Sequence, residues 1–394
     1  MKHLRDSDRA APRLHIYLSS NFWDGLWIVQ QPTCNEIRRD ESVLYVERFV
    51  SIFTILRYPE LWRRLFTWLR GARRIERNLW VLAPLPLFHL GHRAPRLFDL
   101  EFAVQGRWIR WWAARVPGSA RVLWIDNPLY SCAVGTMGEA ASVYHVADEV
   151  SAFPTSHVKT IKRLEQGVLR KVDVVFAAAE QLAMDKRQWQ SNTHTVWNAI
   201  DEELFSAEDG STTLDDLDAI PRPQVAFVGV LDTWVDLDLL GAAARALSQV
   251  QFLIVGPARV DLGVLRGLPN VHLLGRRDRR LIPHILRRSS ASVVPLKRNA
   301  ITERILPLKV FEALAAGALP ICTAFSTDLN RLANDNMILV AHSTAEFIAG
   351  IRNAVSNDDP ELRRHRVEFG RRQTWKARWA EMRSVIDRRL RSRA

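Results

Sequence analysis

Short apolar runs recur along the chain and alternate with polar or helix-like segments. They cover residues 14–18, 42–46, 79–82, 121–125, 142–146 and 172–176, and then 225–228, 251–255, 271–274, 291–294 and 318–322. Runs of this length, bounded by small polar residues, are typical of buried strands. Strands that alternate with helices predict parallel sheets with helices on both faces. The expected fold class is therefore α/β.

The alternation is interrupted once, at residues 206–223. This segment is acidic, contains Gly210 and two prolines, and lacks periodicity, which indicates a linker. We expect an N-terminal domain over residues 1–205 and a C-terminal domain over 224–358, because 394 residues exceed the usual size of one domain. Residues 359–394 have a helical, arginine-rich pattern. They predict a helical tail that either crosses back to the N-terminal domain or ends as a solvated helix.

Charge and cysteine content limit the partners and the compartment. The net charge of +12 favours a nucleic acid, an anionic membrane surface or a phosphorylated substrate. We expect no nucleic-acid partner, because the chain has no lysine-rich tail and no zinc-finger or RNP-type signature. The three cysteines, Cys34, Cys132 and Cys322, are far apart, which indicates a reducing compartment and no disulfide framework.

The location expected from these patterns is the cytoplasm. Residues 1–12 contain no apolar stretch of a signal peptide, and no run of about 18 apolar residues predicts a membrane-spanning helix. A helix over residues 61–77 would place Leu61, Trp62, Leu65, Phe66, Trp68 and Leu69 on one face and Arg63, Arg70, Arg74 and Arg77 on the other. Such a helix suits the inner face of the plasma membrane, and packing on the sheet is the open alternative.

The strongest chemical signal is the segment PLKVFEALAAGALP at residues 307–320. A helix that begins near Pro307 would present its first amides to an anion such as a pyrophosphate. Lys309 adds a positive charge in the first turn, and Glu312 lies on the same face, where a carboxylate can accept hydrogen bonds from a ribose diol. Gly317 ends the helix. A surface ion pair is the alternative for two isolated residues, but the complete pattern favours a binding site.

This segment resembles the donor-site helix of the GT-B glycosyltransferases, especially their bacterial cell-surface polysaccharide branch. The similarity continues at residues 198–201, 229–236, 254–257 and 271–277. It extends to the teichuronic-acid glycosyltransferases and, more distantly, to the xanthan glucuronosyltransferase. The resemblance implies two facing Rossmann-like domains with an interdomain cleft. It also implies a nucleotide-sugar donor, by preference a UDP-sugar, and a saccharide or polyprenyl-diphosphate-linked acceptor in exopolysaccharide or other cell-surface polysaccharide synthesis.

The same resemblance implies a set of donor-binding residues in the C-terminal domain. They are Gly229, Asp232, Gly256, Arg276, Arg277, Lys297, Thr302, Arg304, Lys309 and Glu312. A cation in the loop before the donor helix would neutralise the leaving diphosphate, and we expect no metal or other cofactor. Many retaining members carry two glutamates, but Arg304 occupies the first position here and Glu303 is out of register. This departure favours an inverting transfer.

A base for such a transfer would take the proton of the acceptor hydroxyl. In the segment VYHVADEVSAF at residues 143–153, Asp148 falls at the carboxyl edge of an expected strand. The segment resembles that of the xanthan glucuronosyltransferase with the proposed base, and the match maps to Asp148. Glu149 is the neighbouring alternative. A helix cap is the other interpretation of Asp148.

The loop NFWDGLWIVQQP at residues 21–32 resembles the opening of the teichuronic-type enzymes. The resemblance implies acceptor contacts by Trp23, Asp24, Trp27 and Gln31, with a tryptophan-rich cap on the core as the equal alternative. Two rival functions remain for the whole chain. One is a nucleotide-sugar epimerase on the same fold, and the other is a non-catalytic, membrane-associated partner of a polysaccharide assembly complex.

Overall fold

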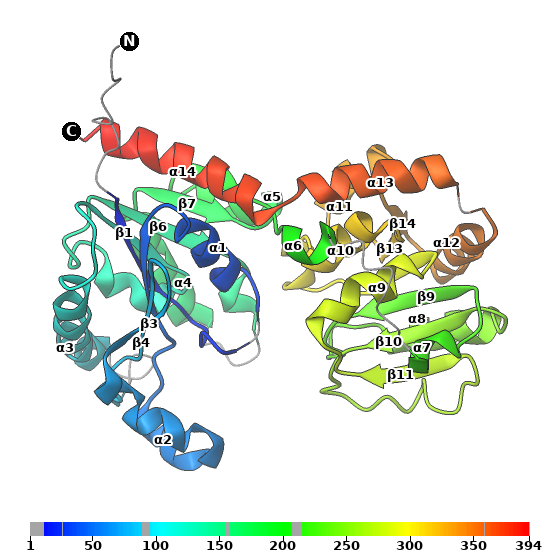
Figure 1. The fold of residues 1–394 in the computed structure, drawn as a ribbon, viewed down its shortest axis with the longest axis horizontal. Coiled ribbons are helices and arrows are strands. Elements are labelled where there is room, and N and C mark those ends of the chain that lie inside the picture. The colour runs from blue at the N-terminus through cyan, green and yellow to red at the C-terminus, as the bar shows by residue number, and fades with distance from the viewer. Residues whose placement is uncertain are drawn as a thin grey trace, which may run out of the picture. The chain divides into compact units, whose positions relative to one another are not determined.

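A computed structural model describes residues 12–25, 27–88, 95–153, 158–206, 215–357 and 359–393. The chain forms two compact units (Figure 1). Unit 1 comprises Met1–Ala178, Leu182–Val196 and Trp379–Ala394, and unit 2 comprises Ala179–Gln181 and Trp197–Arg378. This division differs from the expected one at residue 205, because Ile200, Phe205 and Leu217 are buried in the core of unit 2.

The sheet of unit 1, as far as the chain is described, has eight strands in the order β3-β4-β2-β1-β5-β6-β7-β8. They are β1 (Leu14–Leu18), β2 (Ser42–Val46), β3 (Ala72–Glu76), β4 (Leu79–Leu82), β5 (Arg121–Ile125), β6 (Ala141–Val146), β7 (Val174–Ala177) and β8 (Thr193–Thr195). Neighbouring strands pair in parallel except β3 and β4. Strands β1, β2, β6 and β7 are buried at every residue, which explains their continuous apolar runs.

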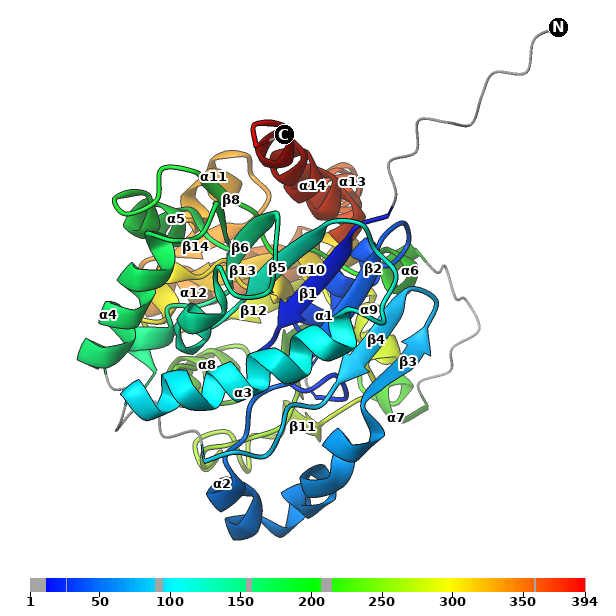
Figure 2. The ribbon, with the colours of Figure 1, turned by 90° about the vertical axis from the view of Figure 1, so that its left-hand side faces the viewer.

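Unit 1 has helices on both faces of this sheet and a further short helix that projects beyond its edge (Figures 1 and 2). They are α1 (Gln30–Ile37), α2 (Ile52–Arg57), α3 (Pro95–Ala113), α4 (Val158–Leu169) and α5 (Glu180–Arg187), with 3-10 turns η1 (Pro59–Arg70), η2 (Pro128–Ala133) and η3 (Val150–Ala152). Side chains alternate between the faces. Tyr17, Trp124 and Phe176 pack in one core with residues of α1 and α14, whereas Tyr144 points to α4 and donates a hydrogen bond to Glu165.

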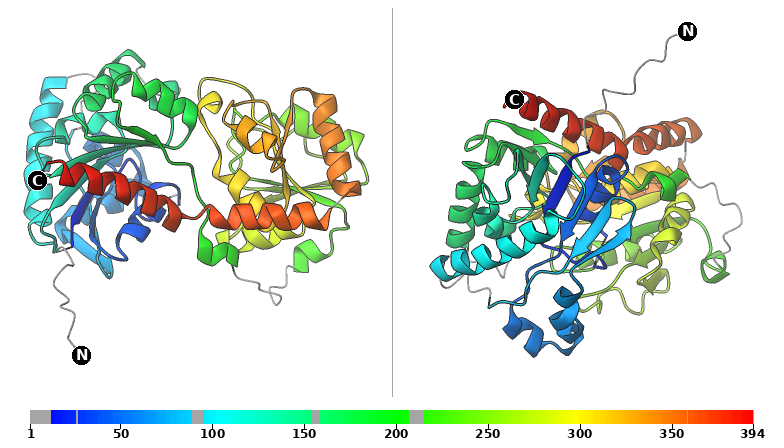
Figure 3. Two further views of the ribbon diagram at one scale, coloured as in Figure 1. Left: turned by 90° about the horizontal axis from the view of Figure 1, so that it is seen from above. Right: turned by 60° about the vertical axis from the view of Figure 1, so that its left-hand side comes forward.

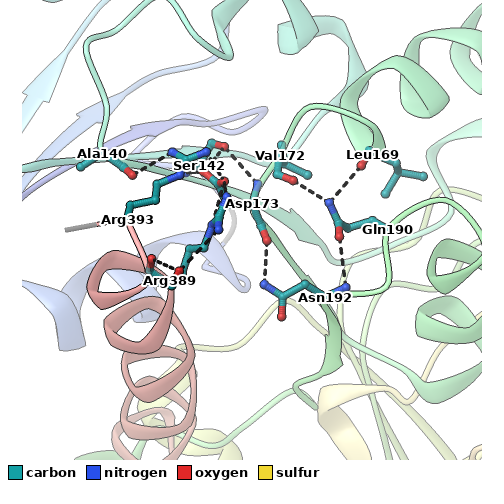
Figure 4. Close-up of polar contacts among 10 residues, drawn as sticks. Ala140, Ser142, Leu169, Val172, Asp173, Gln190, Asn192, Arg389 and Arg393 are labelled. Carbon is teal, nitrogen blue, oxygen red and sulfur yellow. Dashed lines mark hydrogen bonds and ion pairs between the residues drawn. The ribbon is translucent and has the colours of Figure 1, made fainter.

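Helix α14 (Trp375–Arg391) completes the core of unit 1 from Trp379 onward and runs along its sheet (Figures 1 and 3). Figure 4 shows two arginines of the tail directed at Asp173. Arg389 and Arg393 pair with this carboxylate at 2.8 and 2.7 Å, and Ser142 donates to it from its backbone nitrogen and its hydroxyl. The final residues of the expected tail are therefore an integral part of unit 1.

The described sheet of unit 2 is entirely parallel, in the order β11-β10-β9-β12-β13-β14. Its strands are β9 (Gln224–Val228), β10 (Gln251–Val255), β11 (Val271–Gly275), β12 (Ala291–Val294), β13 (Leu319–Thr323) and β14 (Leu339–Ala341). Its helices are α6 (Glu202–Ser206), α7 (Asp215–Asp218), α8 (Leu237–Ala246), α9 (Ile282–Arg287), α10 (Leu308–Ala316), α11 (Leu329–Asn334), α12 (Thr344–Ser356) and α13 (Pro360–Arg372), with 3-10 turns η4 (Arg279–Leu281) and η5 (Thr302–Arg304). As predicted, Gly317 ends α10, in the left-handed conformation.

The α-helix expected over residues 61–77 is wrong, because the chain forms a 3-10 helix up to Arg70 and is not helical beyond it. The 3-10 turn η1 ends at Gly71, whose φ of 61° favours glycine, and the chain then forms β3. A Cβ at Gly71 would overlap the ring of Trp112. Strand β3 was missed because it is an antiparallel edge strand with mostly exposed side chains. Within the described residues, no helix has the length and apolarity to cross a membrane.

Candidate active site

Two glycines bring the loops after β9 and β10 into backbone contact. Gly229 and Gly256 have φ angles of 150° and 140°, which favour glycine. The Gly229 amide donates to the Val255 carbonyl at 2.9 Å, and a Cβ on Gly256 would overlap the Gly229 carbonyl. The strand ends of a parallel sheet are where such folds bind ligands, and here they present backbone rather than side chains.

Lys309 lies in the first turn of α10 beside this glycine contact. A Cβ at Gly229 would be 2.5 Å from Lys309 Nζ, and the ammonium lies over the Phe227 ring, 4.8 Å from its centroid. Burial lowers the pKa of Lys309 to about 8, although Glu312 acts in the opposite direction. Within the described part of the chain, Lys309 makes no hydrogen bond or ion pair. No side chain caps the start of α10, so this cation and the free amides can receive an anion.

Glu312 is half-buried one turn further along α10. Burial raises the pKa of this carboxyl, while Arg279 and Lys309 act to lower it. Lys309 and Glu312, both described, do not form the surface ion pair that was the alternative interpretation of the motif. Glu312 therefore keeps its oxygens available next to a cation, as a diol-binding carboxylate requires.

The segment at residues 198–201 is hydrogen-bonded to the chain just before α10. Asn198 Nδ2 donates to the Leu306 carbonyl at 2.9 Å, and Asp201 pairs with Arg279 at 3.3 Å. Asp201 and Arg279 both act on the Glu312 carboxyl, so they belong to the polar surroundings of the site. Sequence reasoning missed Arg279, although it lies only two residues after the named Arg277.

The other predicted donor residues are distributed around the same edge of unit 2. Asp232 accepts from the Thr233 amide at 2.7 Å and pairs with Arg259 at 3.4 Å. Arg276 is exposed and Arg277 half-buried in the loop after β11, and Lys297 is exposed after β12. Among the described residues, none of these four side chains forms a hydrogen bond or an ion pair with Lys309.

Thr302 and Arg304 belong to the loop that precedes α10. Thr302 is fully buried, and its hydroxyl donates to the Lys297 carbonyl at 2.6 Å and accepts from the Asn299 amide at 2.9 Å. Its role is therefore to shape the loop. Arg304 lines a cavity of about 300 Å³ in unit 2 together with residues that include Arg298 and Ser326.

In unit 1, the structure separates the two candidate bases by their partners. Glu149 accepts from the Ser151 hydroxyl at 2.5 Å and pairs with Lys186 at 2.8 Å. Burial alone would raise the pKa of Glu149, but Lys186 holds it below its usual value. Asp148 follows β6 and makes no hydrogen bond or ion pair with the described residues. Burial raises the pKa of Asp148, which makes it the better proton acceptor of the two.

A buried network fixes the backbone next to Asp148. Lys186 of α5 also pairs with Glu165 of α4 at 2.8 Å, and Tyr144 donates to Glu165 at 2.9 Å. Burial alone would lower the pKa of Lys186, but the two carboxylates raise it above its usual value. The network was not foreseen, because its members lie far apart in the sequence and join only when β6, α4 and α5 pack together.

Of the predicted acceptor residues, three pack within unit 1 and one, Asp24, lies on the surface. Trp23 lies edge-on to Trp27, with ring centroids 5.7 Å apart, and also contacts Tyr45. Gln31 is fully buried and donates from its side-chain amide to the Phe22 carbonyl at 3.1 Å. Asp24 is exposed and pairs with Arg64. Gln31 is thus occupied within its own loop, while Asp24 lies on the surface.

Asp126 is a further candidate that sequence reasoning missed. It follows β5, is buried, and accepts from the Ser20 backbone amide at 2.8 Å and from Gln30 Nε2 at 2.9 Å. Burial raises the pKa of Asp126 to about 6, and the hydrogen bonds from Ser20 and Gln30 oppose that rise. Asp126 therefore ties the end of β1 and the start of α1 to β5. A single polar residue after an apolar run gave too little signal to single it out.

Residues 222–357 match the family of group 1 glycosyl transferases. The match covers Gly229, Gly256, Lys309 and Glu312. A Bacillus subtilis protein, TuaH, described as a teichuronic acid biosynthesis glycosyltransferase, is 27% identical over 227 residues. That alignment covers 55% of this chain and 57% of the relative, so it spans less than two thirds of the relative's length.

Solved structures extend the likeness to both units. Sucrose-phosphate synthase from Thermosynechococcus elongatus matches with a TM-score of 0.70 at 15% identity, over 97% of this chain and all of that chain. Anabaena HepE, in complex with UDP and glucose, matches with a TM-score of 0.63 at 13% identity, over 95% and 100% of the two chains. The chain has the GT-B fold, which confirms the predicted fold class and the resemblance to glycosyltransferases.

Proposed function

We propose that this protein is a glycosyltransferase that moves a sugar from a UDP-sugar to a saccharide or lipid-linked saccharide in cell-surface polysaccharide or exopolysaccharide synthesis. The observation that carries the proposal is the Lys309 ammonium, which lies without an acceptor beside Gly229 at the uncapped start of α10. The family match over the same residues supports it. The UDP and glucose bound by HepE support the choice of nucleotide.

In the proposed donor site, Lys309 and the first amides of α10 bind the diphosphate, and Glu312 accepts hydrogen bonds from the ribose diol. The anionic diphosphate would stabilise the charged form of Lys309 and offset the burial that lowers its pKa. Lys309 and the arginines near the loop at residues 297–304 would neutralise the leaving UDP. The proposed transfer therefore uses no metal and no other cofactor.

The proposed transfer inverts the anomeric carbon, with Asp148 as the base. The acceptor hydroxyl gives its proton to the Asp148 carboxylate as its oxygen bonds to the anomeric carbon. The bond between that carbon and the UDP oxygen breaks, and UDP leaves with the bonding electrons. Glu149 is unsuited to this role because its carboxylate already forms an ion pair with Lys186. We further propose a cytoplasmic protein that works at the inner face of the plasma membrane, where a polyprenyl-diphosphate-linked acceptor would lie.

The donor site is tested by thermal unfolding with UDP, GDP, ADP and dTDP. A nucleotide at about 100 times its dissociation constant adds roughly 2.7 kcal/mol to the free energy of unfolding. We expect UDP to raise the melting temperature of the wild type and of the control Lys162→Ala, which removes an exposed lysine. Lys309→Ala should lose the effect. If no nucleotide stabilises the wild type, the proposed donor site is wrong.

The reaction itself is tested by the products. We expect UDP release from a UDP-sugar only when a saccharide acceptor is present, and NMR of the product should show an inverted anomeric configuration. Conversion of the free UDP-sugar without acceptor would indicate the epimerase instead. A product with retained configuration would contradict the role of Asp148 while leaving the donor site intact.

A further inference from the structure

Unit 1 carries an exposed apolar surface on α2, η1 and the segment after β4. Its members are Phe53, Leu56, Trp62, Phe66, Leu69 and Phe88, here called the aromatic patch. They are 58, 57, 55, 63, 62 and 53% exposed, respectively. Figures 1 and 2 show α2 projecting from unit 1 beyond β3 and β4. Single exposed apolar residues are ordinary in proteins, but six of them on α2, η1 and the segment after β4 indicate a contact surface.

The patch is built into the fold. Ile55 is 2% exposed and anchors α2, while Trp68 packs edge-on against Trp108 with ring centroids 6.2 Å apart. On the outer side, the rings of Phe53 and Phe88 lie 5.7 Å apart, and Trp62 Nε1 donates to the Leu56 carbonyl at 3.4 Å. The inner residues hold the segment in place, and the outer residues have no protein to cover them among the described residues.

The patch residues are interspersed with arginines along the sequence. Residues 53–77 contain seven arginines and two glutamates. Arg57, Arg63 and Arg70 are exposed, whereas one of the glutamates, Glu76, is neutralised by Arg38 at 2.5 Å. Aromatic side chains beside arginine suit a bilayer interface, because the rings enter the acyl boundary while the guanidinium groups reach the lipid phosphates.

We propose that the aromatic patch docks the protein on a bilayer rich in anionic phospholipid. Charge selects this occupant over a second copy of the chain, because a symmetric interface would bring the same arginines against each other. The proposal rests on the patch and its arginines alone, so it stands or falls separately from the proposed transfer reaction.

Flotation with lipid vesicles tests the proposal on the full chain. We expect the protein to bind phosphatidylcholine vesicles that contain phosphatidylglycerol and to bind vesicles of phosphatidylcholine alone more weakly. Added salt should weaken the binding to the anionic vesicles. Replacing Trp62, Phe66 and Leu69 by serine should lower partitioning about tenfold or more. The matched control Val264→Ser with Leu362→Ser, at exposed apolar positions of unit 2, should bind as the wild type does.

A second pair of variants tests the charge. Arg57, Arg63 and Arg70 changed to glutamate should lose binding to the anionic vesicles. The same change at the exposed Arg364, Arg371 and Arg372 of α13 should reduce it less. Circular dichroism confirms that each variant is folded. The proposal is overturned if the wild type does not bind anionic vesicles or if the serine variant binds equally. It is also overturned if sedimentation shows a dimer that the serine variant disrupts, because the patch would then join two copies.

Discussion

Unit 1 and unit 2 both place charged side chains beyond the ends of parallel strands, but they treat those charges differently. In unit 1, Glu149 and Glu165 share Lys186, so each charge has a partner inside the fold. In unit 2, the Lys309 ammonium lies over the Phe227 ring and makes no hydrogen bond or ion pair with the described residues. A partner inside the fold compensates a buried charge. A buried charge without a partner costs stability, and such a charge is retained where a ligand supplies the counter-charge.

The same distinction operates inside unit 1 between adjacent residues. Glu149 is held by Lys186 and Ser151, while Asp148 makes no such bond among the described residues. The paired residue positions the backbone, and the unpaired one is the base that we propose. The comparison supports a structural role for Glu149 and the proposed reactive role for Asp148, and the first of three predictions tests this assignment.

The largest effect is expected at Asp148. Removing a general base costs about 10²–10⁴-fold in rate, so Asp148→Asn should lower kcat on that scale with little change in the melting temperature. Glu149→Gln should affect stability rather than kcat. It should leave kcat within about tenfold and destabilise the fold by roughly 1–3 kcal/mol, because Lys186 loses a charged partner. Steady-state kinetics and urea unfolding of both variants give the answer, and equal kcat values for the two would remove the distinction.

An intermediate effect is expected at the glycine contact of unit 2. Gly256→Ala should destabilise the protein by about 3 kcal/mol or more, since its Cβ overlaps the Gly229 carbonyl in addition to the strain of a positive φ. Gly267→Ala is the matched control, with a φ of 78° and no atom within 4 Å of the added Cβ. It should cost only about 1 kcal/mol. The free energy of unfolding of both variants is measured in denaturant. If both lose a similar amount, the loops after β9 and β10 can move apart to accept the added Cβ.

The smallest effect is the pH dependence of UDP binding. The pKa of Lys309 is about 8 in the free protein, and a bound diphosphate should raise it. Affinity is then fully present below pH 8 and falls as the pH rises through 8, by at most about tenfold per pH unit. Calorimetry between pH 7 and 9 should show this fall in the wild type and a flat profile in Lys309→Met. An equal fall in both would assign the titration to another group.

Much of the fold could be predicted from the sequence because the buried strands of parallel sheets are continuous apolar runs. Edge strands such as β3, β8 and β14 were missed, since short or half-exposed strands lack that run. The residues at 61–77 were misread for a related reason. The chain is helical there up to Arg70, but as a 3-10 helix, and it ends at Gly71, where a Cβ would overlap the ring of Trp112. The contact with Trp112 is distant in sequence, so no local pattern reveals it.

The candidate site was predictable where its residues are close in sequence. Lys309 and Glu312 share one helix, so spacing alone places them on one face. Arg279 and Asp201 approach Glu312 only after unit 2 has folded, and the partners that separate Glu149 from Asp148 come from α4 and α5. Sequence could therefore name the candidate base and its neighbour, but only the packing supplied a physical reason to choose between them.

The packing of α14 on unit 1 affects the order in which the two units can fold during synthesis. Its residues from Trp379 onward complete the core of unit 1, yet the ribosome makes them after all of unit 2. Until α14 has been made, Tyr17 and Trp124 lack the helix that packs on them, and Asp173 lacks its partners Arg389 and Arg393. Unit 2 can fold as it emerges, whereas the core of unit 1 is complete only after α14 has been made.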